Sequence, residues 1–384
     1  MHPARRGLLA LSAAALLPAG MLSARALAAA QSPVEVTDIT GRRVRVAAPV
    51  QRMILGEGRQ TYVMAALERE NPFARVVGWR DDLRKADFDG YSLYEARFPQ
   101  IARLPAFGGW KDGAFDIEQV IALRPDVVVM NLESKVAIDE GGLVAKLDRV
   151  GIPIVFIDFR EKPFEHAERS IAILAQLLGR EAQGQALIDY RAAQIARVTD
   201  RLRDYAGPRP KVMIERAAGY DENCCMSFGN ENFGRMVAVA GGDNIAAGLI
   251  PGTFGTVNPE QIVASRPDVV IVTGANWKLF VPDGAWVGVG PGADAAQARA
   301  RLRRLMERPA YRTLPVARSG RVHAIWHQFY DSPYQFVAIQ ALAKWIHPGL
   351  FADLDPEATF REFHERFLPL PYAPGYWVSL DRPA

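Results

Sequence analysis

The sequence predicts an α/β protein of two similar lobes, each with a mostly parallel sheet, joined by a long rigid helix. Three observations support this fold class. Short apolar strands alternate with helical stretches, which is typical of parallel sheets covered by helices. One helix-proline-strand element occurs twice, and a long helical segment separates the two copies. The length of 384 residues is enough for two domains at roughly 150 residues each.

Strands and helices alternate through the first half of the chain. Residues 52–55 and 75–77 are short apolar runs that end at glycines, as buried strands followed by loops do. Residues 115–130 combine apolar residues at helical spacing, a helix-ending proline and an apolar strand. A helical stretch over residues 139–150 and a strand over residues 154–157 complete the expected first lobe.

The helix-proline-strand element at residues 115–130 returns at residues 257–272. The two copies share eight identical residue types in register, at a spacing of 142 residues (260 − 118). The matching pairs include Glu118 with Glu260, Pro125 with Pro267, and Asp126 with Asp268. One common offset indicates an internal repeat, and therefore two lobes of similar fold.

A long helical segment is expected between the two copies. Residues 163–203 carry apolar side chains at helical spacing, and the helix is expected to be eased or broken near Gly179 and Gly184. A helical connector resists bending, so the lobes are expected to move little relative to each other. The predicted organisation is a signal peptide over residues 1–30, an N-terminal lobe over 31–160, an interlobe helix over 161–206 and a C-terminal lobe over 207–384.

The second lobe is expected to open with a strand over residues 211–215. It is expected to close with a strand over residues 322–326 and a helix over residues 334–345. A final helix is announced by Asp355 as its cap and Pro356 in its first turn.

The N-terminal end has the pattern of a secretory signal peptide. Arg5 and Arg6 precede an apolar run over residues 8–18 and a small-residue end at residues 26–30, with no acidic residue. The run is shorter than a membrane-spanning helix requires, so an exported protein cleaved near Ala30 is expected. The paired arginines are compatible with a twin-arginine export signal and with an ordinary leader.

Charge gives no sign of a nucleic-acid or anionic-lipid partner. Lys plus Arg total 46 and Asp plus Glu total 43, and three of the arginines lie in the expected leader, so the mature chain is balanced. The two cysteines, Cys224 and Cys225, are too few for a disulfide-stapled fold and are not spaced for zinc. Three interpretations stay open for them: a disulfide between neighbours, two buried thiols, or soft ligands for a metal other than ferric iron.

No catalytic motif stands out. The sequence has no GxSxG elbow, GxxxxGK loop, HExxH or GxGxxG pattern. His323 and His327 flank the end of an expected strand rather than sharing one helix face, so they are not expected to share a metal. The chain is therefore expected to bind a ligand rather than to transform it, with no cofactor or metal of its own.

Several motifs resemble those of the periplasmic substrate-binding proteins of ABC importers for iron-siderophores, haem and cobalamin. They are Val36-Thr37-Asp38 with Gly41-Arg42, Gln51-Arg52-Met53-Ile54, the repeated helix-Pro-Asp-strand element, the interlobe helix, Ala240-Gly241-Gly242-Asp243-Asn244-Ile245 and Gly320-Arg321-Val322, and they span nearly all of residues 34–345. The resemblance implies the two-lobed class with a helical backbone, class III. It also implies a monomeric periplasmic receptor that holds its ligand between the lobes and delivers it to an ABC permease in the inner membrane.

The candidate ligand site lies in the loops beyond the carboxyl ends of the strands, where open α/β layers bind ligands. Aromatic faces and arginine forks in these loops suit a flat or chelated anion. A ferric siderophore-like chelate is expected, because a chelator supplies most of the oxygen donors that hard ferric iron prefers. Tyr330, Tyr220 or His327 could fill a coordination position that the chelator leaves open. The candidate ligand-binding residues are Arg59, Trp79, Arg80, Trp110, Lys111, Arg216, Tyr220, Phe254, Trp277, His327 and Tyr330.

The resemblance further implies an acidic residue on the outer surface of each lobe that meets the permease. The candidates are Glu95 in the first lobe and Glu231 or Asp243 in the second. The expected function is capture of a ferric chelate and its delivery, unaltered, to the permease. The alternatives are a receptor for haem or cobalamin, a periplasmic enzyme that acts on a chelate through its two cysteines, and a sensor that signals through a protein partner.

Overall fold

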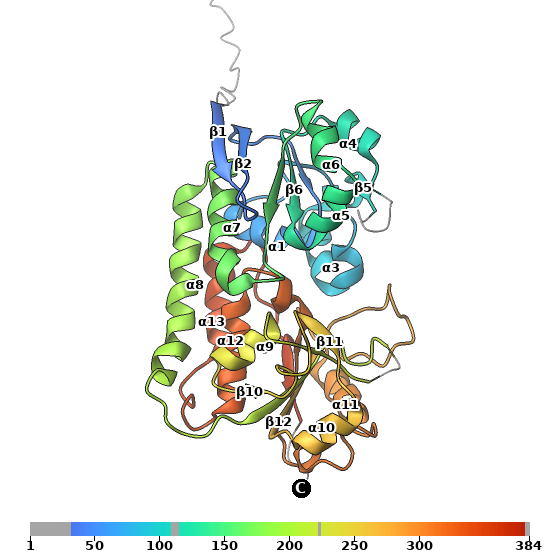
Figure 1. The fold of residues 1–384 in the computed structure, drawn as a ribbon, viewed down its shortest axis with the longest axis vertical. Helices are drawn as coiled ribbons and strands as arrows, with labels where there is room; N and C mark the ends of the chain where they lie inside the picture. Colours follow the sequence, from blue (N-terminus) through green and yellow to red (C-terminus); the bar gives the residue numbers. More distant parts are fainter. Residues whose placement is uncertain (1–31, 109–114, 222–223, 381–384) are drawn as a thin grey trace, which may run out of the picture. The chain divides into compact units, whose positions relative to one another are not determined.

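Two sheets, one in each half of the chain, confirm the predicted α/β class (Figure 1). The computed structural model describes residues 32–108, 115–221 and 224–380. The predicted signal peptide lies outside these ranges, so its cleavage and export route stay predictions. No helix in the described ranges combines the length and the apolar character needed to cross a membrane.

Within the described residues, the first sheet has five parallel strands in the order β5-β4-β3-β6-β7. An antiparallel hairpin of β1 and β2 precedes it. The strands are β1 (Ser32–Thr37), β2 (Arg43–Ala48), β3 (Met53–Leu55), β4 (Val76–Arg80), β5 (Ala106–Phe107), β6 (Val127–Asn131) and β7 (Ile154–Ile157). The helices are α1 (Thr61–Leu67), α2 (Leu83–Ala86), α3 (Phe88–Arg97), α4 (Ile117–Leu123), α5 (Lys135–Glu140) and α6 (Leu143–Asp148). The predicted helix over residues 139–150 is thus two short helices that meet at a pair of glycines.

The second sheet is mixed, with a parallel centre. In the described part of the chain, β10, β8, β12 and β13 run parallel, whereas β9, β11 and β14 pair antiparallel at the edges. The strands are β8 (Lys211–Glu215), β9 (Met226–Phe228), β10 (Asp243–Asn244), β11 (Phe254–Thr256), β12 (Val269–Gly274), β13 (Val322–Trp326) and β14 (Trp377–Ser379). The helices are α9 (Phe233–Val239), α10 (Pro259–Ser265), α11 (Ala295–Leu305), α12 (Gln335–Ile346) and α13 (Pro356–Phe367), and Asp355 caps α13 as predicted.

The repeated element makes the same contacts in both sheets. It forms α4 with β6 in the first copy and α10 with β12 in the second. Each helix ends on an arginine in the left-handed conformation, Arg124 at φ 45° and Arg266 at φ 49°. Two residues after each arginine, an aspartate accepts a hydrogen bond from a backbone N–H at the start of the neighbouring strand. Asp126 accepts from Arg52 at 2.9 Å, and Asp268 accepts from Lys211 at 2.8 Å. The residues shared by the two copies therefore produce the same contact between neighbouring strands in both sheets.

The connector is two helices rather than one. Helix α7 (Pro163–Leu178) packs on β1, β2 and β7, and α8 (Glu181–Leu202) packs on α7 and on α12 of the second half. The break falls at Gly179, whose φ of +65° suits glycine. Gly184 lies inside α8, where an added Cβ would come within 2.5 Å of the Ala175 Cβ. Because Gly184 has no side chain, α7 and α8 pack closely together. Helix α8, roughly 33 Å long, also contacts α12 and so links the two halves of the chain.

Candidate functional site

The strand order brings loops from both sheets to their carboxyl edges. In the first sheet, β3 and β6 are neighbours although β4 and β5 lie between them in sequence, which makes a switch point. In the second sheet, β8, β12 and β13 are adjacent and parallel. The residues that follow β3 and β7 are therefore presented from one sheet, and those that follow β8, β12 and β13 from the other.

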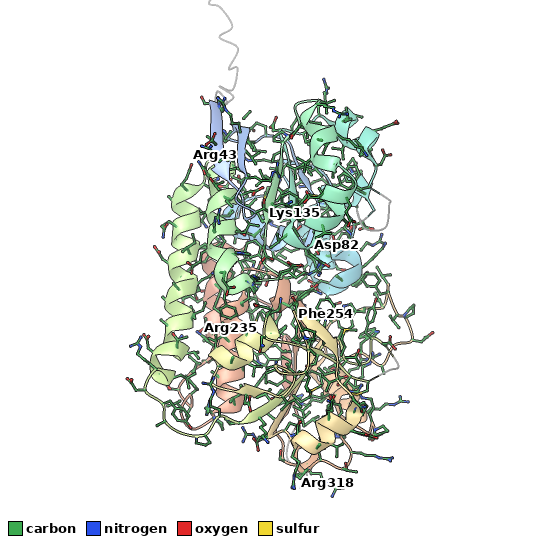
Figure 2. All side chains as sticks on the ribbon, in the orientation of Figure 1. Arg43, Asp82, Lys135, Arg235, Phe254 and Arg318 are labelled. Carbon is green, nitrogen blue, oxygen red and sulfur yellow. A yellow bond between two sulfur atoms is a disulfide. The ribbon has the colours of Figure 1, made fainter. Side chains whose placement is uncertain are left out.

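One cavity gathers side chains from both sets of loops, and we call it the arginine cavity. Its empty volume is about 660 Å³, including solvent at its mouth. Figure 2 labels Asp82 on the first half and Phe254 on the second, at the level where the two halves meet. The lining residues are Arg59, Arg80, Asp82, Ala86, Arg160, Arg216, Ala217, Tyr220, Trp277, Phe280, His327, Gln328 and Tyr330.

Arg59 is a buried guanidinium surrounded by acids. Its Nε donates to Asp82 Oδ2 at 2.7 Å and its Nη1 lies 3.2 Å from Asp331 Oδ2, while Nη2 pairs with Glu57. Burial alone would lower the pKa of Arg59, but Tyr330 and the two aspartates outweigh it and raise the pKa. Arg59 therefore stays charged, and its charge is compensated by carboxylates of the protein itself.

Tyr330 lies between two guanidinium groups. Its hydroxyl oxygen accepts hydrogen bonds from Arg59 Nη1 and Arg160 Nη2, and Arg160 also pairs with Glu133. Burial alone would raise the pKa of Tyr330, but Arg160 and Arg59 outweigh it, and the pKa falls below that of an ordinary phenol. The two guanidinium groups thus make the Tyr330 hydroxyl easier to deprotonate than an ordinary phenol.

His327 is a neutral imidazole held by Thr273. Burial, with Arg216 and the other arginines nearby, lowers the pKa of His327 well below its ordinary value. Its Nδ1 lies 2.8 Å from Thr273 Oγ1, which also accepts the Ala217 N–H and lies within hydrogen-bond distance of the Glu215 carbonyl. The Thr273 proton serves either the Glu215 carbonyl at 3.4 Å or Nδ1 at 2.8 Å, and in both cases the neutral ring keeps one nitrogen lone pair. The neutral His327 ring, with its nitrogen lone pair, lies beside the Tyr330 ring, and the two ring centroids are 4.4 Å apart.

Arg216 differs from Arg59 because no carboxylate lies within 4.0 Å of it among the described residues. Its Nη1 donates to the Met226 sulfur at 2.7 Å, its guanidinium carbon lies 4.3 Å from the Phe254 ring centroid, and its Nε is buried without a partner in the described chain. Burial lowers the pKa of Arg216, with Arg160 and Arg59 adding to the effect. This guanidinium is available to an anionic ligand.

Aromatic side chains close the cavity on the side of the second sheet. Tyr220 lies edge-on to Trp277 at 5.3 Å and to Phe280 at 6.1 Å. The carbonyl of Ala86, on the first half of the chain, accepts hydrogen bonds from Trp277 Nε1 at 3.1 Å and from Gln328 Nε2 at 2.7 Å. These two bonds fasten the second-half wall to the first.

Seven of the predicted ligand residues line the arginine cavity: Arg59, Arg80, Arg216, Tyr220, Trp277, His327 and Tyr330. Trp79 is instead part of the core, packed edge-on against Phe73, because β4 continues through it by pairing with β5. Phe254 does not line the cavity, but its ring packs against the guanidinium group of Arg216. Trp110 and Lys111 lie outside the described residues.

The prediction missed Arg160, Asp82, Gln328 and Phe280. Arg160 follows β7, so the rule that selected the other loops also applied to it. Asp82 and Phe280 stand two and three residues beyond predicted members of the set. The signal was present for each of these, but the loops extend further into the cavity than the strand ends alone indicated.

Cys224 and Cys225 form a disulfide in the structure. Among the described residues, Glu215 is the carboxylate whose oxygen lies within 4.8 Å of both sulfur atoms. Glu215 is already engaged, because it accepts from both Arg308 amino groups, Nη1 at 2.8 Å and Nη2 at 2.5 Å, and from the Tyr311 hydroxyl at 2.7 Å. The cluster therefore favours the disulfide interpretation over a metal site.

The three predicted docking acids differ in exposure. Asp243 is exposed, whereas Glu95 and Glu231 are half-buried. Glu95 accepts a hydrogen bond from the Tyr91 hydroxyl at 2.8 Å. Burial raises the pKa of Glu231, with Glu165 adding to the effect. The three acids thus differ in their exposure to solvent, and their contact with the permease stays a prediction.

Known proteins resemble this chain over most of its length. The family model described as periplasmic binding protein matches residues 90–327. The TroA-like periplasmic binding protein FepB from Veillonella parvula is 28% identical, with a TM-score of 0.83 over 91% of this chain and 100% of that chain. The molybdate-binding protein MolA of Haemophilus influenzae is 22% identical over 94% of this chain and 97% of its own length.

Two further solved structures share the fold. MolA bound to molybdate has a TM-score of 0.68 and 20% identity over 89% of this chain and 99% of that one. The periplasmic haem-binding protein RhuT from Roseiflexus has a TM-score of 0.55 and 21% identity over 78% of this chain and 99% of its own. At these identities the likeness shows a shared architecture, while the names of MolA and RhuT give two different ligands, molybdate and haem.

Proposed function

This chain belongs to the periplasmic binding protein family, and on that premise we propose that it captures an anionic ferric chelate in the arginine cavity. It is a solute-binding protein of an ABC importer, and such proteins deliver their ligand to a permease. The chelate, the residues that hold it and the surfaces that meet the permease are our proposals.

The observation that carries the proposal is the pairing of Tyr330 with His327. A phenolate favoured by two guanidinium groups is a hard oxygen donor, which suits ferric iron. The neutral imidazole beside it offers a nitrogen lone pair. A chelator that fills four of the six octahedral positions leaves two, and these two side chains would supply them.

Arg216 provides the counter-charge. A ferric ion held by four catecholate oxygens carries net negative charge, and Arg216 has no carboxylate neighbour in the described chain to neutralise it. The faces of Tyr220 and Trp277 would cover the aromatic part of such a chelate. Charge, donor atoms and shape therefore favour the same class of ligand.

A second candidate is a metal oxyanion such as molybdate. The observation that favours it is the convergence of four arginines in one small cavity, since guanidinium groups bind tetrahedral oxyanions well. An oxyanion needs no metal donor from the protein, so the lowered pKa of Tyr330 would have no role in its binding.

Visible spectroscopy during titration separates the two candidates. The probes are the ferric complex of a tetradentate bis-catecholate and sodium molybdate, each added to the full-length chain. We expect the ferric complex to bind and its charge-transfer band to shift as the Tyr330 oxygen enters the coordination sphere. Tyr330→Phe should abolish the shift and weaken binding about tenfold or more. Tyr220→Phe is the matched control and should preserve the shift.

Two outcomes would count against the ferric chelate. Tight binding of molybdate with none of the ferric complex would support the oxyanion receptor instead. Binding of the ferric complex with the same spectrum in wild type and Tyr330→Phe would remove Tyr330 as a ligand.

A further inference from the structure

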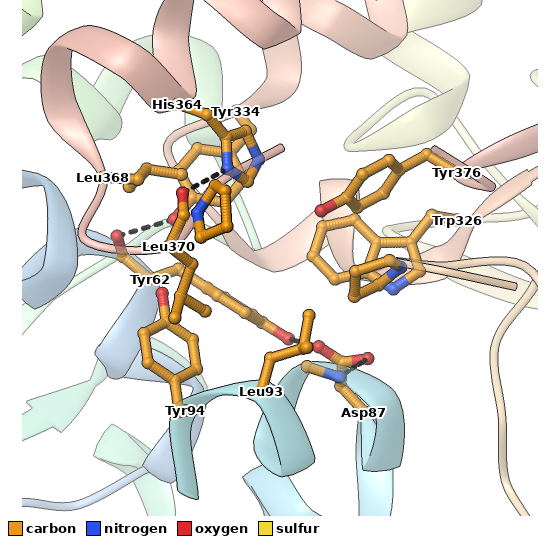
Figure 3. A pocket seen from close by; sticks show the side chains of 13 residues that line it. Tyr62, Asp87, Leu93, Tyr94, Trp326, Tyr334, His364, Leu368, Leu370 and Tyr376 are labelled. Carbon is orange, nitrogen blue, oxygen red and sulfur yellow. Dashed lines mark hydrogen bonds between the residues drawn. The ribbon is translucent and has the colours of Figure 1, made fainter. Parts of the chain in front are cut away.

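A second cavity lies next to the arginine cavity, and we call it the aromatic cavity. It is enclosed by side chains of α1, α3, β13 and the C-terminal segment, with about 400 Å³ of empty space including its mouth (Figure 3). The half-exposed Leu93 and the exposed Pro371 stand at its rim. Its described lining is Tyr62, Asp87, Gly90, Leu93, Tyr94, Pro291, Trp326, Tyr334, His364, Leu368, Leu370, Pro371 and Tyr376.

The charge of this cavity is opposite to that of the arginine cavity. No lysine or arginine is among its described lining residues, and no cationic side chain lies within 4.0 Å of Asp87 in the described chain. Asp87 is 1% exposed and accepts the Tyr62 hydroxyl at 2.8 Å and the Gly90 N–H at 3.3 Å. These bonds explain its role as the cap of α3, but they leave its negative charge uncompensated.

Aromatic rings stand around the carboxylate. Tyr62 and Trp326 meet edge-on with centroids 5.5 Å apart, and Trp326 and Tyr376 meet edge-on at 5.2 Å. Ring faces carry negative quadrupole charge and attract cations. The carboxylate and the rings therefore act in the same electrostatic direction.

His364 adds an unused acceptor at the other side of the cavity. Its Nδ1 lies 3.1 Å from the Leu370 carbonyl, so this nitrogen must donate, and Nε2 keeps the lone pair. Nε2 is buried without a partner in the described chain, and burial lowers the pKa of His364 to about 4, which keeps the ring neutral. Figure 3 shows His364 and Asp87 on opposite sides of the space.

We propose that the aromatic cavity is a second binding site, for a small organic cation that carries a hydroxyl or N–H group. The cationic head would lie against Asp87, Tyr62, Trp326 and Tyr376, and the polar group would donate to His364 Nε2. A cation fits because the buried Asp87 carboxylate and the unpartnered His364 Nε2 are electron-rich, while the ring N–H of Trp326 is directed to Asp87. The proposal is independent of what the arginine cavity binds.

Calorimetric titration of the full-length chain with choline tests this site. The matched probe is 3,3-dimethylbutan-1-ol, which has the same shape and hydroxyl group but no charge. We expect choline to bind in a one-to-one ratio and the neutral alcohol to bind at least about tenfold more weakly, since cation–π contacts are each worth about 0.5–2 kcal/mol. Equal affinity for the two probes, or no choline binding, would overturn the proposal.

Two variants locate the binding. Asp87→Asn keeps an N-cap side chain and should lose about tenfold in choline affinity. Leu93→Lys places a positive charge at the rim and should also weaken choline binding, whereas Leu93→Gln should not. Unchanged choline affinity in both Asp87→Asn and Leu93→Lys would show that choline binds elsewhere and would refute the site.

The pH profile gives a separate readout. Burial raises the pKa of Asp87 to about 7, so choline affinity should fall between pH 8 and pH 5 in wild type and stay flat in Asp87→Asn. A flat wild-type profile would contradict the role of Asp87. The titratable and polar groups that face it are Tyr62 of α1, Asp89 and Tyr94 of α3, Trp326 of β13, Tyr334, Tyr376, and His364 of α13 across the cavity.

Discussion

The two cavities share their walls and differ in their charge. Ala86 lines the arginine cavity and the next residue, Asp87, lines the aromatic cavity. Across from them, Trp326 lines the aromatic cavity and His327 the arginine cavity. Adjacent residues at the ends of α2 and β13 thus line cavities of opposite charge. The comparison teaches that the chemistry of a loop residue here depends on which side of a thin partition it faces.

The cavities also differ in how their buried charges are compensated. Arg59 has carboxylates on three sides, whereas Arg216 and Asp87 have no oppositely charged neighbour within 4.0 Å in the described chain. Compensated charges hold a structure together, because removing one partner strands the others. Uncompensated charges are available to ligands.

Arg59→Met should have the largest effect. It leaves the buried Asp82 without its cation, and it leaves the buried Glu57 and Asp331 with Arg160 alone, at 3.4 Å and 3.7 Å. Breaking such a buried cluster costs about 3–5 kcal/mol of unfolding free energy. Urea denaturation measures it, with Arg318→Met, at the far end of the second half in Figure 2, as the exposed control. Equal stability of the two variants would show that the Arg59 cluster does not stabilise the fold.

Asp87 should make the stability of the protein depend on pH. Its pKa rises from 3.8 in the unfolded chain to about 7 in the fold, so the folded state binds the proton more tightly. Stability should therefore fall as pH rises from about 4 to about 7, by up to about 4 kcal/mol, and level off above that. Asp87→Asn should lack this dependence. Midpoints of urea denaturation at pH 5 and pH 8 measure this dependence in both proteins. The same change with pH in wild type and Asp87→Asn would contradict the role of Asp87.

Arg216→Met should weaken ligand binding without lowering stability. The variant removes a buried cation that has no carboxylate partner in the described chain, so no protein acid is stranded. Loss of charged hydrogen bonds worth about 1.5–3 kcal/mol should reduce affinity for the ferric bis-catecholate about 10–100-fold. Fluorescence titration and urea denaturation of the same preparation measure both properties. A destabilised variant would place Arg216 with Arg59 instead.

Tyr62→Phe should have the smallest effect. It removes the hydroxyl that donates to Asp87, which should cost about 1 kcal/mol of unfolding free energy. Loss of that donor should also raise the pKa of Asp87 further. Tyr205→Phe is the control, because the Tyr205 hydroxyl makes no hydrogen bond recorded in the described chain. Urea denaturation at pH 8 compares the two, and equal destabilisation would indicate a general effect of losing a tyrosine hydroxyl.

The sequence predicted the architecture well because the architecture depends on local patterns. The strands over residues 154–157, 211–215 and 322–326 have the predicted bounds, since continuous apolar runs mark buried parallel strands. The repeated Asp126 and Asp268 were found by spacing alone. The connector was predicted as a helical segment eased or broken near Gly179 and Gly184, and the break falls at Gly179. Nothing local shows, however, that the chain reverses there and packs back on itself.

The arginine cavity was predicted in part. Arg59, Arg216 and Tyr330 follow strands, so a rule about strand ends finds them. Trp79 was misplaced because pairing with β5 extends β4 through Arg80, and successive side chains of a strand face opposite sides. Arg80 therefore lines the cavity and Trp79 enters the core.

The aromatic cavity could not be predicted from sequence. Tyr62, Asp87, Trp326 and Tyr376 come from four distant segments, and none stands in a recognisable motif. Tyr376 lies in an irregular stretch just before β14. Its position depends on tertiary packing against Trp326 and Phe360, which no local pattern encodes.

The carbonyl oxygen of Ala86 accepts from both Trp277 and Gln328, and a carbonyl has only two lone pairs. Both are occupied, so parting the walls exposes three polar groups to rehydration in a single event. Opening the arginine cavity between these walls would therefore require both hydrogen bonds to break together.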